Sequence, residues 1–477
     1  MLAWNAHNVA PKEVLITGKV NVGTIKEVSY TIPQRGIFHW GLTATSPVDA
    51  QGNFEIKIPC EQTSIVAIGG VDQTKKKLIL SPGDHIQISL GAEKDEDFFE
   101  AEGPNEEGQK LFQALPYPGF VQVAARKYFK DTVISEIKSK IAAEKAEELE
   151  PFSVLLKAQK ITSAFYELVR ADRDCYYATM QAQLVWVKLL RVDRDKIKTF
   201  SPAHQAWFAE TYREYPLSSK SLICSFWWQE YANTFQDVSI FLDKDFDPKQ
   251  NEERYKNETA HTFQMKDAPK RFNGEFLEYF QFSYLYDACL QKKYEKELIA
   301  LFEQFKQQYP QSPFTQYLQP LVEPIVEYHL AQAADFSDQY KFVENYASLN
   351  SLEEALQSFK GKKLYIDVWA TWCGPCKAEF AHKEGLKKLL AEKGYDILYI
   401  SIDEPDREEA WKGMIKFYKL EGNHLRTNKN FNKDLREIFD QGGALSIPWY
   451  LIVNEEGKIV NTKAKRPSNL QGLEGQL

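Results

Sequence analysis

Residues 363–380 read KLYIDVWATWCGPCKAEF and contain the chain's only two cysteines that lie close together in sequence. The run begins with a nearly continuous apolar segment, KLYIDVWA, which predicts a strand in a sheet that is covered on both faces. Cys373 and Cys376 follow, separated by Gly374 and Pro375. Three explanations compete: a redox couple, half of a metal site, or two buried small residues.

The two alternatives to a redox couple, a metal site and two buried small residues, fit the sequence poorly. A structural zinc site commonly uses two such cysteine pairs, or one pair and two spaced histidines. The chain has no second pair, and His382 is the only histidine soon after the motif. Two inert core cysteines at the start of a helix would be an odd use of an intervening Gly and Pro.

A redox couple accounts for each residue of the motif. Cys373 ends a predicted strand–helix turn, where the unpaired N–H groups and the positive dipole end of the helix stabilise a thiolate. Pro375 suits the first helical turn because its missing N–H had no acceptor there. The two-residue spacer returns Cys376 within reach of a disulfide. We therefore expect Cys373 to be the exposed, attacking sulfur and Cys376 the more buried, resolving one.

The stretch YIDVWATWCGPCKAEF resembles the thioredoxin superfamily, and more narrowly the TlpA/ResA-like thiol–disulfide oxidoreductases. WCGPC is the active-site sequence of thioredoxins, and Glu379, three residues past the second cysteine, matches the TlpA/ResA pattern. Asp367 stands where thioredoxins place a buried strand carboxylate. Ile447-Pro448 precedes the strand WYLIV, where the family has its cis-proline. The resemblance covers about residues 345–477, and the longer layout resembles multidomain envelope proteins of Bacteroidetes.

Two acidic residues of this region are candidates for a catalytic role. Asp367 lies in an otherwise apolar strand, where desolvation makes a charge costly. A buried carboxylate with a raised pKa could pass protons to and from the resolving thiol. Glu379 is either part of the site or an ordinary solvated helix residue.

Three further residues are candidates for substrate binding. Trp372 is expected to form a wall beside the attacking sulfur, with ordinary packing as the alternative. Pro448 is expected to be the cis-proline, although it could merely end a loop. It would hold the backbone at Ile447 ready to pair with an extended substrate segment and would keep metals off the thiols.

The rest of the chain predicts two further domains. Residues 12–102 show short alternating segments separated by turns, which indicate an antiparallel β-sandwich or barrel. Residues 105–345 repeat apolar positions three and four apart, which predicts an all-helical domain. Residues 346–477 alternate strand and helix and end in a hairpin, as expected for an α/β thioredoxin-like domain with a right-handed crossover.

Composition excludes some functions for this 477-residue chain. Its 59 basic and 67 acidic residues give a formal charge of −8 without a basic cluster, which argues against nucleic-acid binding. No apolar run is long enough to span a bilayer. The remaining cysteines lie apart among apolar neighbours and are expected to be buried: Cys60, Cys175, Cys224 and Cys289.

Together these features predict an enzyme that exchanges disulfides with protein substrates. The Gly-Pro spacer resembles that of reducing thioredoxins and favours the reducing direction, with oxidation and isomerisation as alternatives. We expect an upstream dithiol electron donor and no cofactor or metal. The alternative is an envelope protein that binds a peptide or glycan and carries a vestigial thioredoxin-like domain. The first residues lack a secretory signal, which favours the cytoplasm, whereas the resemblance implies the periplasm or cell envelope.

Overall fold

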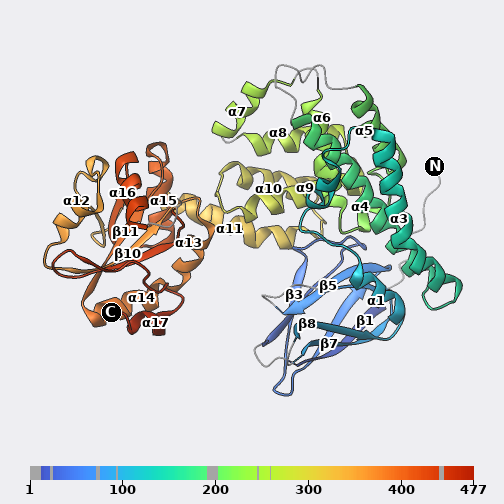
Figure 1. Ribbon diagram of the computed structural model, residues 1–477, viewed down its shortest axis with the longest axis horizontal. Helices are drawn as coiled ribbons and strands as arrows, with labels where there is room; N and C mark the ends of the chain where they lie inside the picture. The colour runs from blue at the N-terminus through green and yellow to red at the C-terminus, as the bar shows by residue number, and fades with distance from the viewer. Residues whose placement is uncertain are drawn as a thin grey trace. The chain divides into compact units, whose positions relative to one another are not determined.

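The computed structural model describes residues 12–21, 25–70, 76–92, 95–190, 202–243, 246–257, 259–439 and 445–477 (Figure 1). The chain divides into two compact units. The first runs to Ala288 and includes Leu301–Gln319, and the second comprises Cys289–Ala300 and Pro320–Leu477. Each unit is described separately below.

The N-terminal part of the first unit is rich in sheet. Its strands are β1 (Lys12–Val20), β2 (Glu27–Thr31), β3 (Thr43–Pro47), β4 (Asn53–Cys60), β5 (Ser64–Gly70), β6 (Lys76–Leu80), β7 (His85–Ala92) and β8 (Asp95–Glu102). They form two four-stranded sheets, ordered β4-β1-β7-β8 and β3-β2-β5-β6. Alternate residues of β4 are buried, and one hydrophobic cluster takes side chains from both sheets. This period-two pattern is what made the strands recognisable in the sequence.

One feature of these sheets departs from the expected antiparallel arrangement. β1 and β7 pair in parallel, with Ile16 opposite Ile86. The chain forms five other strands between them, so the connection is long enough to bring β7 back in the direction of β1. A hairpin connection would have forced the antiparallel alternative.

The middle of the chain is helical. Its helices are α1 (Glu106–Ala114), α2 (Val121–Ala125), α3 (Ile134–Lys157), α4 (Ser163–Leu190), α5 (Pro202–Glu214), α6 (Trp228–Phe241), α7 (Pro248–Lys256), α8 (Ala260–Asp267), α9 (Gly274–Leu290), α10 (Glu297–Gln308) and α11 (Thr315–Gln332). Among the described residues between 105 and 339, every regular element is a helix. None of the described helices combines the length and apolar character that a membrane span requires.

The second unit contains a six-stranded sheet ordered β14-β13-β10-β11-β12-β9. Its strands are β9 (Tyr340–Phe342), β10 (Lys363–Trp369), β11 (Tyr395–Ser401), β12 (Gly422–Arg426), β13 (Trp449–Val453) and β14 (Ile459–Asn461). Its helices beyond α11 are α12 (Leu352–Leu356), α13 (Gly374–Glu379), α14 (Lys383–Lys393), α15 (Glu408–Tyr418), α16 (Lys429–Phe439) and α17 (Leu470–Glu474). β10 is parallel to β11 and antiparallel to β13. Helices α14 and α17 lie on one side of this sheet, and α15 and α16 on the other (Figure 1).

Two local expectations need correction. Residues 340–342, expected at the end of the helical region, form β9 and pair with β12 in the C-terminal sheet. A three-residue edge strand is too short to produce a recognisable alternation. The helix expected after the cysteine pair is also interrupted, because a 3₁₀ turn over Phe380–His382 separates α13 from α14. The division into three domains at 102/105 and 345/346 otherwise stays a prediction.

Candidate active site

The two cysteines of the motif form a disulfide at the beginning of α13, with their Cα atoms 5.3 Å apart. β10 ends at Trp369, and a short turn leads to Cys373, the residue that caps the helix. The Cys373 Sγ accepts a hydrogen bond from the backbone N–H of Cys376 at 3.1 Å. A sulfur placed at unpaired helix N–H groups is stabilised when it carries negative charge. The arrangement can therefore support a reactive thiolate at Cys373.

The exposure of Cys373 differs from the expectation. In this disulfide form the residue is only 4% exposed, and Cys376 is 1% exposed. The Cys373 sulfur is bonded to Cys376 and faces the first helical turn, where it accepts the Cys376 N–H. The neighbouring Trp372 is 61% exposed, so a large apolar surface stands beside the buried disulfide.

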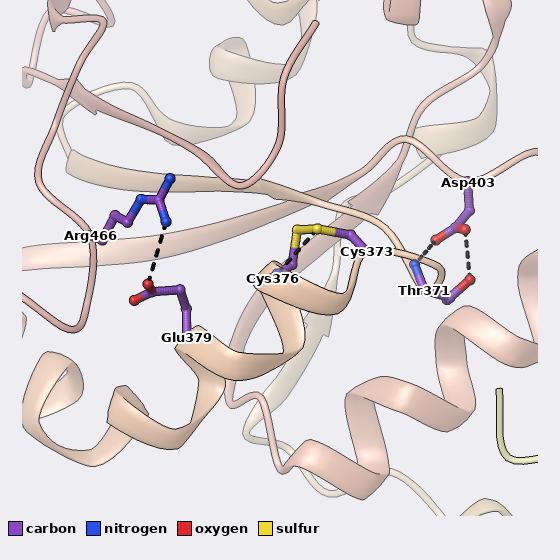
Figure 2. The surroundings of a disulfide bond; sticks show 6 residues. All are labelled: Thr371, Cys373, Cys376, Glu379, Asp403 and Arg466. Atoms are coloured by element: carbon purple, nitrogen blue, oxygen red, sulfur yellow. Dashed lines mark hydrogen bonds and ion pairs between the residues drawn. A yellow bond between two sulfur atoms is a disulfide. The ribbon is translucent and has the colours of Figure 1, made fainter. Parts of the chain in front are cut away.

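A buried aspartate that the sequence analysis missed holds the turn before Cys373. Asp403, two residues after the end of β11, accepts hydrogen bonds from the backbone N–H and hydroxyl of Thr371 at 2.9 and 2.7 Å (Figure 2). The Ser401 hydroxyl donates to the same carboxylate at 2.7 Å. β10 and β11 are parallel neighbours, so polar residues after their carboxyl ends meet. That topology was the only available signal for Asp403.

Asp367 lies in the middle of β10 and is 1% exposed. Burial raises the pKa of its carboxyl well above the ordinary value, and the nearby negative charge of Glu379 adds to the increase. Among the described residues, its Oδ1 has no hydrogen-bond partner. The carboxyl can therefore hold a proton under conditions in which an exposed aspartate has lost one.

Glu379 ends α13 and is 8% exposed, so the alternative of a solvated helix residue is wrong. Its carboxylate accepts hydrogen bonds from the Ser468 backbone N–H at 2.9 Å and the Ser468 hydroxyl at 3.1 Å. The Arg466 guanidinium lies 3.9 Å away (Figure 2). Both partners come from the C-terminal segment before α17, and their distance in sequence hid them from motif analysis.

The peptide bond between Ile447 and Pro448 is cis, and both residues are half-buried. The following residue, Trp449, begins β13 and pairs with Val368 of β10. This antiparallel register places the cis peptide at the end of β10 from which the dithiol turn leaves. Ile447, Pro448 and Trp372 thus belong to the same edge of the sheet as the disulfide.

Lys377, directly after Cys376, is a second residue that sequence reasoning missed. It is 6% exposed, and its Nζ donates to the backbone carbonyl of Lys292 at 2.9 Å. Burial lowers the pKa of its ammonium to about 8, and the charges of Lys292 and Arg407 also lower it, while that of Asp403 opposes them. The sequence does not indicate this hydrogen bond, because the accepting carbonyl lies 85 positions before the lysine.

The other cysteines are separate from this site. Four of them are buried and form no disulfide: Cys60, Cys175, Cys224 and Cys289. Within the described ranges, no group of three or more His, Cys, Asp or Glu side chains is arranged to hold a metal ion.

Comparison with known proteins places the same region in a family. The family model described as Redoxin matches residues 338–477. The thiol-disulfide oxidoreductase ResA of Bacillus thuringiensis subsp. konkukian is 30% identical over 105 residues, which cover 22% of this chain and 56% of that protein. The thioredoxin-like protein YneN of Bacillus subtilis is 30% identical over 131 residues, covering 27% and 66% respectively. The first match thus spans little more than half of the relative's length.

Similar solved structures cover the same part of the chain. A thiol-disulfide oxidoreductase from Bacteroides fragilis is 25% identical, and the match covers 25% of this chain and 84% of that one, with a TM-score of 0.21. The C-terminal region, residues 338–477, thus matches the Redoxin family model and is similar to thiol-disulfide oxidoreductases of the ResA type.

Proposed function

We propose that this chain is a thiol–disulfide oxidoreductase that reduces disulfides in protein substrates. The observation that carries the proposal is the disulfide at the start of α13, whose Cys373 sulfur accepts the Cys376 N–H. A dithiol at this position can alternate between disulfide and thiolate forms. The Redoxin match to residues 338–477 agrees with that chemistry.

The reaction begins with the reduced enzyme. The Cys373 thiolate attacks one sulfur of the substrate disulfide, whose S–S bond breaks. The other substrate sulfur leaves as a thiolate and takes up a proton, and a mixed disulfide joins Cys373 to the substrate. Trp372, Ile447 and Pro448 lie at this edge of the sheet and would contact the substrate segment, with the Ile447 backbone available for strand-like pairing.

Resolution requires Cys376 to lose its proton. Asp367 is the proposed acceptor, because a buried carboxyl with a raised pKa exchanges a proton with a thiol at a smaller energetic cost than an exposed one. The Cys376 thiolate then attacks the Cys373 sulfur, and the second substrate sulfur leaves. The substrate has gained two electrons, and the enzyme returns to the disulfide form seen here. We propose that the negative charge of the buried Glu379 carboxylate keeps the pKa of Asp367 high.

A complete cycle needs an electron donor, which we propose to be an upstream dithiol. The Gly374-Pro375 spacer is the one found in reducing thioredoxins, which supports the reducing direction over oxidation or isomerisation. We propose a location in the periplasm or cell envelope by likeness to the TlpA/ResA-like type. The β-rich region and the helical region of the first 339 residues are proposed to select or position the substrate.

Single-turnover reduction of insulin tests this function. The full chain is reduced, freed of the reductant and mixed with excess insulin. We expect each chain to lose one dithiol as insulin thiols appear, with Cys373→Ser inactive and Cys60→Ser unchanged. Failure of the reduced chain to transfer electrons, together with rapid oxidation of reduced ribonuclease by the disulfide form, would overturn the reducing direction.

A further inference from the structure

A segment that connects α9 to α10 reaches the active-site helix within the second unit. Residues 289–300 belong to the same compact unit as α13. The Lys292 carbonyl in this segment accepts the hydrogen bond from the buried Lys377 ammonium at 2.9 Å. The ring of Tyr294 lies 5.9 Å from the same ammonium. The segment therefore supplies both a dipole and an aromatic face to a charge next to the dithiol.

Aromatic contacts fix the position of this segment. The hydroxyls of Tyr294 and Tyr418 are 2.8 Å apart, and the rings of Tyr294 and Tyr328 stack at 5.0 Å. The Tyr294 backbone carbonyl also lies 2.8 Å from the His329 Nε2. These three contacts hold Tyr294 in place. We therefore expect the Lys292 carbonyl, two residues earlier, to stay fixed when the Lys377 side chain moves.

The same cluster continues to the base of the dithiol turn. Tyr418 contacts Phe380, which follows α13, with ring centroids 5.1 Å apart. Phe380 in turn packs edge-on against Trp369, the last residue of β10, at 5.3 Å. The segment thus packs, through Tyr418 and Phe380, against the last residue of β10.

The Lys377 ammonium interacts with a carboxylate, that of Asp403, at the Cys373 end of α13. Asp403, which holds the Thr371 turn, attracts the ammonium, while Lys292 and Arg407 repel it. Figure 2 shows Asp403 and Thr371 at the Cys373 end of α13 and Glu379 at the other end. The Lys377 ammonium thus has one partner at the Cys373 end of α13, Asp403, and another, the Lys292 carbonyl, that lies outside the Redoxin match.

We propose that Lys377 is a positioning residue that stabilises the Cys373 thiolate, and that residues 289–300 hold its ammonium in place for this purpose. The proposal deepens the proposed function, on which it rests in taking the dithiol as redox-active. A cation held in a partly desolvated place interacts with a nearby anion more strongly than one in water. Residues 289–300 thereby couple a segment outside the Redoxin match to the redox equilibrium of the dithiol.

The equilibrium in question is the exchange with glutathione. The Cys373–Cys376 disulfide takes two electrons and two protons from two glutathione thiols, which become one glutathione disulfide. Loss of the cation destabilises the thiolate form of the product. Lys377→Met should therefore lower the equilibrium constant for reduction about threefold to tenfold at pH 7 and move the alkylation midpoint of Cys373 to higher pH. A tenfold change corresponds to about 30 mV for this two-electron couple.

The test uses the full chain in glutathione buffers of fixed ratio. Lys377→Arg restores the charge and should return most of the equilibrium constant, a rescue that a purely structural role of the side chain would not predict. Lys388→Met, at an exposed position of α14, is the matched control and should behave as the wild type. Far-UV circular dichroism of each variant verifies the fold.

The role of residues 289–300 is tested by combining variants. Tyr294→Ala should shift the equilibrium in the same direction as Lys377→Met, and the double variant should shift no further than Lys377→Met alone. Additive shifts would overturn the role of the segment, and an unchanged constant in Lys377→Met would overturn that of the lysine. A wild-type chain whose dithiol does not equilibrate with glutathione would instead contradict the proposed function itself, and the inference with it.

Discussion

Asp403 and Thr371 are joined by two hydrogen bonds, from the Thr371 amide at 2.9 Å and from its hydroxyl at 2.7 Å. Thr371 lies two residues before Cys373, so the buried carboxylate fixes the backbone that presents the attacking sulfur. The pair also links two parallel strands, because Thr371 follows β10 and Asp403 follows β11. The geometry of the dithiol is therefore a property of the sheet as well as of the WCGPC motif.

We predict that Asp403→Ala destabilises the second unit and slows disulfide exchange. The change leaves the two Thr371 donors without their acceptor. A hydrogen bond to a charged group contributes about 1.5–3 kcal/mol to the free energy of unfolding. Urea unfolding and the rate of insulin reduction measure the two effects. Asp406→Ala, at an exposed position nearby, is the control and should change neither. A full exchange rate in Asp403→Ala would show that the motif positions Cys373 unaided.

After reduction, we expect Cys373 to be alkylated faster than any other cysteine of the chain near neutral pH. Its place at the helix N-terminus favours the thiolate, whereas burial raises the pKa of Cys224 and of Cys289 to about 12. Iodoacetamide labelling against pH, with adducts mapped by mass spectrometry, measures the order of reaction. Cys373→Ser should remove the fast phase. Equal labelling of Cys373 and Cys289 across the titration would contradict the assignment.

Asp367→Asn should slow resolution of the mixed disulfide at neutral pH, because the proton of Cys376 loses its proposed acceptor. Stopped-flow tryptophan fluorescence, with Trp372 as a reporter beside the disulfide, follows this step. Asp406→Asn serves as the control. A mutant with an unchanged rate and pH profile would assign Asp367 a purely structural role.

The same substitution should stabilise the oxidised chain at pH 7. The folded-state pKa of Asp367 is raised, so the folded chain binds the proton more tightly and the wild type loses stability as pH rises from the unfolded value of about 3.9 through the raised value. Asparagine cannot ionise, so the variant should lack this loss. The midpoint of urea unfolding at pH 4 and pH 7 provides the comparison, and a larger loss in the variant would contradict it.

His424 should make the second unit sensitive to acid. Burial lowers the pKa of its imidazole from 6.5 to about 4, although the hydrogen bond to the Leu420 carbonyl partly opposes this effect. The unfolded chain then binds more protons in this range, so the stabilisation is complete above pH 6.5 and is lost as pH falls toward 4. The loss is on the order of 3 kcal/mol for a shift of this size.

The corresponding variant is His424→Gln, which keeps a donor for the Leu420 carbonyl. We expect its free energy of unfolding to fall less than that of the wild type between pH 6.5 and pH 4, while the exposed control His382→Gln follows the wild type. Parallel curves for His424→Gln and the wild type would show that the acid sensitivity lies in other groups.

The parts of the fold that could be predicted are those written in local pattern. The apolar strand before Cys373, the turn and the start of α13 follow from residue types within a span of fewer than twenty positions. Strand β9 could not be predicted, because its three residues acquire meaning only beside β12. The parallel pairing of β1 with β7 was missed because direction depends on a connection through five other strands.

The site divides in the same way. The site residues that the sequence predicted lie inside the motif or are unusual for their position. Asp367 is a carboxyl in an apolar strand, and Pro448 directly precedes a strand. Asp403, Ser468 and Lys292 carry no such sign, since each acts on the site through a partner at least 32 positions away. Contacts of this kind depend on tertiary packing, so they cannot be predicted from the local pattern of one sequence.

The most direct measurement of the central claim is the trapping of a mixed disulfide in the full chain. Reduced Cys376→Ser is mixed with a peptide disulfide, and the products are mapped by mass spectrometry before and after treatment with dithiothreitol. The account predicts one adduct per chain, joined through Cys373 and released by the thiol, with none in Cys373→Ser and only transient adduct in the wild type. An adduct distributed over Cys60, Cys175, Cys224 or Cys289, or no adduct at all, would contradict it.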